Sequence, residues 1–146
     1  MDIERLMMAA TEGNVGAQTL LGMFYLDGIG VERSYPLALQ WLTSAAEKGA
    51  PRAIVNLGAM YEQGLGVEQD LEEAIRLYEQ AAGRNEFMAF ILLARIHQDG
   101  RGRPANSRKA ADWYRQALAL EHAGLESPEL DEARQFLQKT GLDREH

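Results

Sequence analysis

Apolar residues in this chain recur at steps of three and four positions, the spacing of an amphipathic helix. Residues 17–27 predict one helix, and residues 34–47 predict a second. Gly28 follows the first helix, where glycine adopts the left-handed conformation without a Cβ clash. Ser34 is a good N-cap for the second helix. The apolar stripe of the second helix is Ala38, Trp41, Leu42 and Ala45.

This helix-turn-helix unit repeats every 36 residues. Good N-cap residues of three different types recur at that step, at Ser34, Asp70 and Asn106. A single unit cannot bury both faces of its helices, whereas stacked neighbours can. The sequence therefore predicts an all-α stack of helical hairpins. Glycine pairs mark the turns at the same period: Gly28 and Gly30, Gly64 and Gly66, Gly100 and Gly102.

One repeat domain is predicted over residues 1–146. Its parts are an N-terminal half repeat (1–16, with a helix over 3–11), three repeats (17–52, 53–88 and 89–124) and a C-terminal capping helix (125–146). Ser127 is the expected N-cap of that last helix, and Pro128 its first residue. The large residues expected in the core are Tyr25, Trp41, Leu57, Tyr61 and Trp113.

The charge and composition exclude several classes of function. The chain has 146 residues, a formal net charge of −7 and no cysteine. An acidic protein repels nucleic acid and anionic membranes, so neither is an expected partner. Disulfides, thiolate-bound metals and thiol nucleophiles are excluded. No apolar run spans a membrane, and the first residues carry acids where a signal peptide carries bases, so a cytoplasmic protein is expected.

The repeated residues resemble the Sel-1-like repeat family, a relative of the tetratricopeptide repeat. The third unit departs from the pattern, with Ala94 in place of glycine, His97 in place of tyrosine and Arg103 in place of valine. The first unit carries the match at Ala17, Leu21, Gly22, Tyr25, Gly28, Gly30, Val31, Ala38, Trp41, Ala45 and Ala46. The second carries it at Ala53, Leu57, Gly58, Tyr61, Gly64, Gly66, Val67, Asp70, Ala74, Tyr78, Ala81 and Ala82.

The resemblance implies a right-handed α–α superhelix (solenoid) with the first helices on the concave side. It also implies a protein-binding adaptor, since most members serve in signalling and assembly and many are bacterial. A cysteine-rich branch of the family binds β-lactams, but this chain lacks the disulfides of that branch. Fold alone does not fix function.

Enzyme chemistry has no support in the sequence. The glycine pairs lack the following Lys-Ser/Thr and the preceding strand of a phosphate-binding loop. The histidines, His97, His122 and His146, show no metal-ligand spacing, and a part-buried structural role is expected for His97. No serine lies in a Gly-x-Ser-x-Gly motif. We therefore expect no enzyme activity, no catalytic residues, no metal and no cofactor.

Candidate partner-binding residues lie on the first helices, beside the Leu-Gly core pair. By analogy with the tetratricopeptide arrangement, they line the concave face, and their mixed character suits a peptide or a partner helix. Asn56 is expected to hydrogen-bond the backbone of an extended peptide. The alternative is that these residues only face solvent or contact their own repeat. The candidates are Thr19, Met23, Leu26, Asp27, Val55, Asn56, Ala59, Glu62, Gln63, Ile91, Arg95, Gln98 and Asp99.

A basic edge is specific to this chain. Residues 95–115 carry six basic side chains and two acidic ones in an otherwise acidic protein. We hypothesise that this edge meets an acidic partner or a phosphorylated segment. The alternative is a solvated loop. The edge comprises Arg101, Arg103, Arg108 and Lys109.

The favoured function is a non-catalytic adaptor that binds a peptide or partner protein on its concave surface. One alternative is a small hydrolase or ligand binder resembling the β-lactam-binding branch. Another is a self-associating structural protein, because the half repeat would expose Met7 and Met8 at an open end. We expect a monomer or a weak homo-oligomer.

Overall fold

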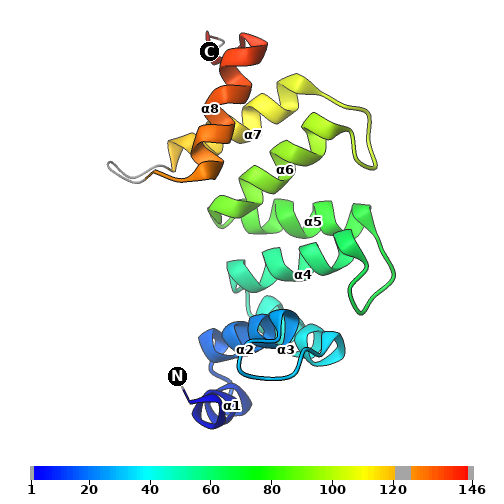
Figure 1. The fold of residues 1–146 in the computed structure, drawn as a ribbon, viewed down its shortest axis with the longest axis vertical. Coiled ribbons are helices and arrows are strands. Elements are labelled where there is room, and N and C mark those ends of the chain that lie inside the picture. Colours follow the sequence, from blue (N-terminus) through cyan, green and yellow to red (C-terminus); the bar gives the residue numbers. More distant parts are fainter. Residues whose placement is uncertain (1, 121–125, 145–146) are drawn as a thin grey trace. The chain divides into compact units, whose positions relative to one another are not determined.

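The structure is a computed structural model that describes residues 2–120 and 126–144. Within these ranges the chain is helical, with no β-strand (Figure 1). The predicted all-α class is confirmed. The elements are α1 (Ile3–Thr11), α2 (Val15–Asp27), α3 (Tyr35–Glu47), α4 (Pro51–Gln63), α5 (Leu71–Ala82), α6 (Phe87–Asp99), α7 (Ser107–Ala119), α8 (Pro128–Thr140) and the 3-10 helix η1 (Leu142–Arg144).

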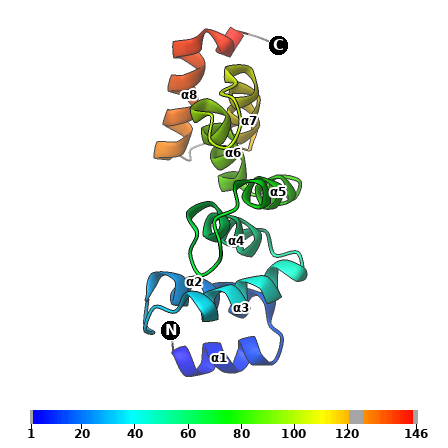
Figure 2. The same ribbon diagram turned by 90° about the vertical axis from the view of Figure 1, so that its right-hand side faces the viewer.

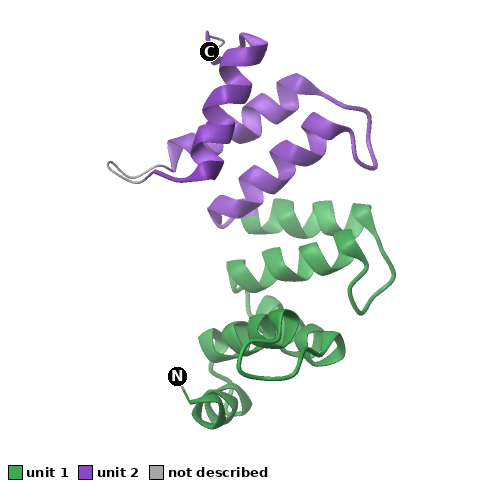
Figure 3. Ribbon diagram, in the orientation of Figure 1, with its two compact units in different colours: residues 1–81 green, residues 82–146 purple. Residues whose placement is uncertain are grey.

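The chain divides into two compact units, residues 1–81 and residues 82–146 (Figure 3). In the first, which we call unit 1, α2 packs against α1 and α3, and α3 packs against α4. In the second, unit 2, α7 packs against both α6 and α8, and η1 follows α8. Figure 2 shows α8 alongside α6 and α7.

The turns inside the hairpins follow from local chemistry. Gly28, Gly64 and Gly100 end α2, α4 and α6 with φ of 68°, 70° and 70°. These values lie in the left-handed region, which glycine reaches without strain. The amide of Ser34 then donates to the carbonyl oxygen of Tyr25 at 2.9 Å, and the same bond recurs in the other two repeats. The predicted turns are therefore confirmed.

The predicted helix starts are also confirmed. The side-chain oxygens of Ser34, Asp70 and Asn106 each accept a bond from the amide three residues further on, at 3.2, 3.0 and 3.0 Å. Such bonds satisfy amides that have no partner within the helix. Ser127 caps α8 in the same way, at 3.2 Å, and Pro128 is its first residue. Helix starts at four points of the chain are thus determined by side chains next to them.

The prediction of the large core residues is confirmed for Leu57 and wrong for the four aromatic residues. Leu57 is buried, but Tyr25, Trp41, Tyr61 and Trp113 are only half-buried. The aromatic side chains with no exposed surface are Tyr78 and Tyr114, which share one position of the repeat.

The neighbouring helix explains this difference. Tyr78 lies against Gly58, where a Cβ atom would come within 2.7 Å of the tyrosine ring. Leu42 lies against Gly22 in the same way, at 2.6 Å. The glycines allow close approach of the helices, so the residue at this position enters the space between them. The indole of Trp41 lies one residue earlier and packs at the edge of the cluster between α1 and α2.

Candidate functional site

A cavity of about 340 Å³ opens in unit 1 between α2 and the start of α4. Its α2 residues lie three and four positions apart, so they share one face of the helix. The turn into α4 closes the other side. The lining residues are Gly16, Thr19, Leu20, Met23, Ala50, Pro51 and Arg52. Thr19 and Met23 are among the residues predicted from the sequence to bind a partner, whereas the other five are not.

The lining is mainly aliphatic. The hydroxyl of Thr19 donates to the carbonyl oxygen of Val15 at 2.9 Å, so this polar group is satisfied within α2. Leu20 and Met23 are half-buried. Arg52 is the one charged residue of the lining, and its side chain is exposed. The cavity therefore combines an apolar interior with a single positive charge at its rim.

The remaining candidates in unit 1 have varied surroundings. The side-chain amide of Asn56 donates to the carbonyl oxygen of Arg52 at 2.8 Å, one turn earlier in α4. Ala59 is half-buried, and Val55 is 9% exposed. Asp27 and Gln63 are exposed at the ends of their helices. Asn56 and Ala59 thus continue the accessible face of α4 beyond Arg52.

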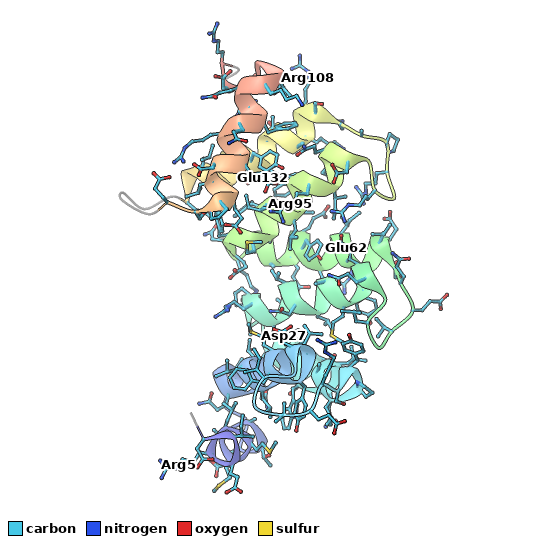
Figure 4. All side chains as sticks on the ribbon, viewed as in Figure 1. Arg5, Asp27, Glu62, Arg95, Arg108 and Glu132 are labelled. Carbon is cyan, nitrogen blue, oxygen red and sulfur yellow. The ribbon has the colours of Figure 1, made fainter. Side chains whose placement is uncertain are left out.

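Two candidates in unit 1 make contacts with neighbouring helices of that unit. Leu26 packs against the α3–α4 cluster that contains Leu42. Glu62 stands at the same repeat position as Leu26, and its carboxylate accepts a bond from the hydroxyl of Tyr78 at 2.8 Å. Figure 4 labels Asp27 and Glu62 near the ends of α2 and α4.

In unit 2 two candidates on α6, Arg95 and Gln98, are bound by side chains of α8 and α7. The guanidinium of Arg95 donates to both carboxylate oxygens of Glu132, at 2.7 and 2.8 Å (Figure 4). The hydroxyl of Tyr114 lies 3.0 Å from Glu132 and 2.7 Å from the side-chain oxygen of Gln98. Ile91 has no exposed surface. These polar side chains therefore form one network that fastens α8 to the α6–α7 hairpin.

The network shifts the pKa of its members. The hydrogen bonds from Arg95 hold the pKa of the Glu132 carboxyl below its ordinary value. The same hydrogen bonds raise the pKa of the Arg95 guanidinium. Burial, and then the bond to Glu132, raise the pKa of the Tyr114 phenol. The charged forms of Arg95 and Glu132 are both favoured by folding.

Loss of the Glu132 charge is expected to weaken unit 2 in a pH-dependent way. Because folding lowers the pKa of this carboxyl, its ion pair stabilises the protein above the ordinary value of 4.5. That stabilisation is lost as the pH falls through the lower, folded-state pKa. Denaturation with urea should therefore show Glu132→Gln to be less stable than the wild type at neutral pH, with the difference shrinking in acid.

A matched control for this prediction is Glu129→Gln, which removes the same charge from the first turn of α8. Glu129 raises the pKa of Arg95 only through its charge, and its effect is smaller than that of Glu132. Its replacement should have a smaller effect. A stability difference between wild type and Glu132→Gln that stayed constant from neutral pH into acid would contradict the assignment.

The predicted basic edge is unevenly exposed. Arg108 and Lys109 are exposed at the start of α7, whereas Arg101 and Arg103 are half-buried in the preceding turn. The Nε atom of Arg101 lies 3.9 Å from a carboxylate oxygen of Asp99. Part of the positive charge in this turn is therefore already balanced by unit 2 itself.

The described residues contain neither a metal-binding cluster nor a membrane-spanning helix. In residues 2–120 and 126–144 there is no cluster of three or more metal-ligating side chains. His97 is 4% exposed, consistent with the structural role predicted for it, while His122 and His146 lie outside the described residues. No helix among those that the structure describes has the length and apolar character needed to cross a membrane.

Helical hairpins with capped starts and glycine ends, repeated at a fixed period, define a helical-repeat protein. The Sel1 repeat family matches residues 15–49, 51–85 and 89–122. This chain belongs to the Sel1 repeat family. The predicted family and the predicted solenoid fold class are both confirmed. Proteins of this fold are generally interaction modules.

Three known structures are similar to this chain. A Sel1 repeat protein from Oxalobacter formigenes is 38% identical, with a TM-score of 0.66 over 73% of this chain and 42% of that chain. A protective antigen present in uropathogenic Escherichia coli strains, displaying an SLR fold, is 27% identical, with a TM-score of 0.77 over 97% of this chain and 33% of that one. Cysteine rich protein B of Helicobacter pylori is 26% identical, with a TM-score of 0.64 over 82% of this chain and 90% of that chain.

The chain spans less than half the length of the first two of these proteins. No curated protein matches it.

Proposed function

We propose that this chain is a non-catalytic interaction module. It binds an extended segment of a partner protein on the face of unit 1 formed by α2 and α4, the first helices of two repeats. The observation that carries this proposal is the open apolar cavity between α2 and the start of α4. Cavities of a few hundred Å³ with apolar walls and few polar groups are typical of binding sites. An apolar side chain of the partner would fill the cavity.

The accessible face of α4 suits the backbone of such a segment. The Nδ2 group of Asn56 is used by Arg52, whereas no donor in the described part of the chain bonds its Oδ1 atom. That oxygen is available to accept a backbone N–H from an extended partner. Small Ala59 lies one turn further on and leaves room for the segment to continue toward exposed Gln63.

The contrast with unit 2 supports the choice of unit 1. Arg95 stands at the repeat position of Met23, and it is bound to Glu132 of α8. In unit 1 the corresponding Met23 lines an open cavity. We therefore place the proposed site on Thr19, Met23, Asp27, Asn56, Ala59 and Gln63, and we add Gly16, Leu20 and Arg52 to it.

We also propose that the repeats run over residues 17–52, 53–88 and 89–124, after a half repeat over residues 1–16 and before a capping helix over residues 125–146. The recurring turn bond and N-caps support this division. In this scheme α8 stands in for the first helix of a further repeat.

Filling the cavity is expected to weaken binding at least tenfold. Peptides selected from a displayed random library on the wild-type protein should lose at least tenfold in affinity for Gly16→Leu, a loss of about 1.4 kcal/mol. Gly16 lies at the cavity wall in the first turn of α2, and a Cβ there meets only the side-chain oxygen of Asn14, at 3.4 Å. The added side chain should therefore enter the cavity and leave the fold intact. Fluorescence anisotropy measures the affinity.

Gly16→Ala is the matched control, because it adds the Cβ atom without filling the cavity. It should keep most of the affinity, and both variants should melt at or above the wild-type temperature, since glycine weakens a helix. Selected peptides that bound Gly16→Leu as tightly as the wild type would rule out this cavity as the binding site.

A further inference from the structure

The geometry points to the chemistry of the partner. We propose that the α2–α4 cavity of unit 1 takes an apolar side chain, and that Arg52 at the rim pairs with a carboxylate beside that side chain. The partner segment is therefore one in which a large apolar residue adjoins aspartate or glutamate. This inference rests on the proposed function and specifies its ligand.

The cavity walls indicate the apolar residue of the proposed partner segment. Leu20, Met23, Ala50 and Pro51 present aliphatic groups, and Thr19 has its hydroxyl bonded within α2. Met23 is unbranched and polarizable, so it adjusts to aliphatic or aromatic side chains.

Arg52 indicates the acidic residue of the proposed partner segment. Unit 1 has five basic residues, and four of them make contacts of their own. Arg5 lies 3.9 Å from Asp2, Arg76 donates to Glu73 at 3.0 Å, Lys48 donates to the carbonyl oxygen of Gly13 at 3.2 Å, and Arg33 lies 5.9 Å from the ring centroid of Tyr35. Within residues 2–81, the side chain of Arg52 has no ion pair or hydrogen bond. It is left available in a unit with twelve acidic residues.

The start of α4 reinforces the preference for a carboxylate. Ala50 occupies the N-cap and has no side-chain oxygen, so no side chain bonds the first amides of α4. The N-terminal end of a helix carries a partial positive charge that favours anions. A carboxylate beside Arg52 would be stabilised by both the guanidinium and this end of the helix.

The same observations argue against a polyanion as the occupant. Unit 1 is acidic overall, with twelve acidic and five basic residues, so a nucleic acid would be repelled. The walls of the cavity are apolar and hold one positive charge. A single carboxylate next to an apolar group satisfies both features.

The test uses the full chain and short, end-blocked peptides of glycine and serine with a central pair: Phe-Asp, Asp-Phe, Phe-Asn, Asn-Phe or Ala-Asp. Titrations followed by amide chemical shifts give the affinities. At low ionic strength, the better of the two Phe/Asp peptides should bind the wild type about fivefold tighter than its asparagine counterpart. Ala-Asp should bind weakest, and salt should reduce the preference for aspartate.

Arg52→Gln should remove the preference for aspartate while its melting temperature stays that of the wild type. The matched control is Arg5→Gln, which removes the same charge from α1, where the Arg5 side chain is 88% exposed. It should keep the preference. Arg52→Glu should favour asparagine over aspartate.

Equal affinity of the aspartate and asparagine peptides for the wild type, or an unchanged preference in Arg52→Gln, would overturn the assignment of Arg52. If both peptide types then still bound and Gly16→Leu still blocked them, the proposed binding face would stand without the acidic partner. If neither type bound, and library peptides also ignored Gly16→Leu, the binding face itself would be wrong.

Discussion

Replacement of Tyr114 with alanine is expected to lower the free energy of unfolding by about 3–5 kcal/mol, the usual cost of removing a buried aromatic side chain. Tyr114 has no exposed surface, and its ring lies 5.1 Å from that of Phe136. Its hydroxyl joins Gln98 of α6 to Glu132 of α8. The truncation would leave a cavity where α6, α7 and α8 meet. Urea denaturation followed by circular dichroism measures the loss.

Two controls separate the contributions to this effect. Tyr114→Phe keeps the ring and removes the hydroxyl, so it should lose only about 1 kcal/mol. Trp113→Ala removes a larger aromatic side chain from the adjacent position, where it is half-buried and packs against Phe90 at 5.9 Å. It should cost less than Tyr114→Ala. The reverse order for these two alanine variants would show that Trp113, as the sequence suggested, carries more of the core.

Gly66→Ala is expected to be the second most harmful of these changes, with a loss of about 2–4 kcal/mol. Gly66 has φ of +72°, a conformation that a side chain disfavours. An added Cβ would also lie 2.7 Å from the Cβ atom of Tyr35 at the start of α3. Backbone strain and overpacking therefore add, and neither the turn nor the helix can move without disturbing the other. Thermal and urea denaturation report the loss.

The matched control is Gly28→Ala, at the C-terminal end of α2. Its φ is +68°, close to that of Gly66, but the nearest atom to an added Cβ is that of Arg33, at 3.4 Å. Only the strain remains, so the loss should be about 1–2 kcal/mol. Equal losses in the two variants would show that Gly66 does not approach α3 as closely as described.

The helix boundaries could be predicted from the sequence because they depend on nearby chemistry. A cap such as Asp70 bonds an amide three residues away, and a glycine such as Gly64 ends a helix through its own φ. Burial of the aromatics could not be predicted in the same way. It depends on which residue meets a glycine on the neighbouring helix, and the stripe alone does not distinguish Trp41 from the position occupied by Leu42 and Tyr78.

The candidate site shows the same division. Thr19 and Met23 could be proposed from the sequence, by analogy with the first helices of tetratricopeptide repeats. Arg52 could not, because its part in the cavity depends on how the turn into α4 packs against α2. Arg95 was expected to meet a partner, but it binds Glu132, a residue 37 positions away on a helix outside the repeat pattern. The sequence did contain one signal of these contacts within the repeats. Each repeat with a tyrosine at position 78 or 114 also has a hydrogen-bond acceptor, Glu62 or Gln98, sixteen residues earlier.

That coincidence bears on how such a chain can be engineered. Leu26 and Leu42 in the first repeat are replaced by Glu62 and Tyr78 in the second. The residues at these two repeat positions therefore change together. If the residue at each position were chosen separately, a tyrosine could be combined with a leucine opposite it, and its hydroxyl would be buried without an acceptor. When segments are exchanged between repeats of this protein, the residues at these two positions therefore have to be exchanged together.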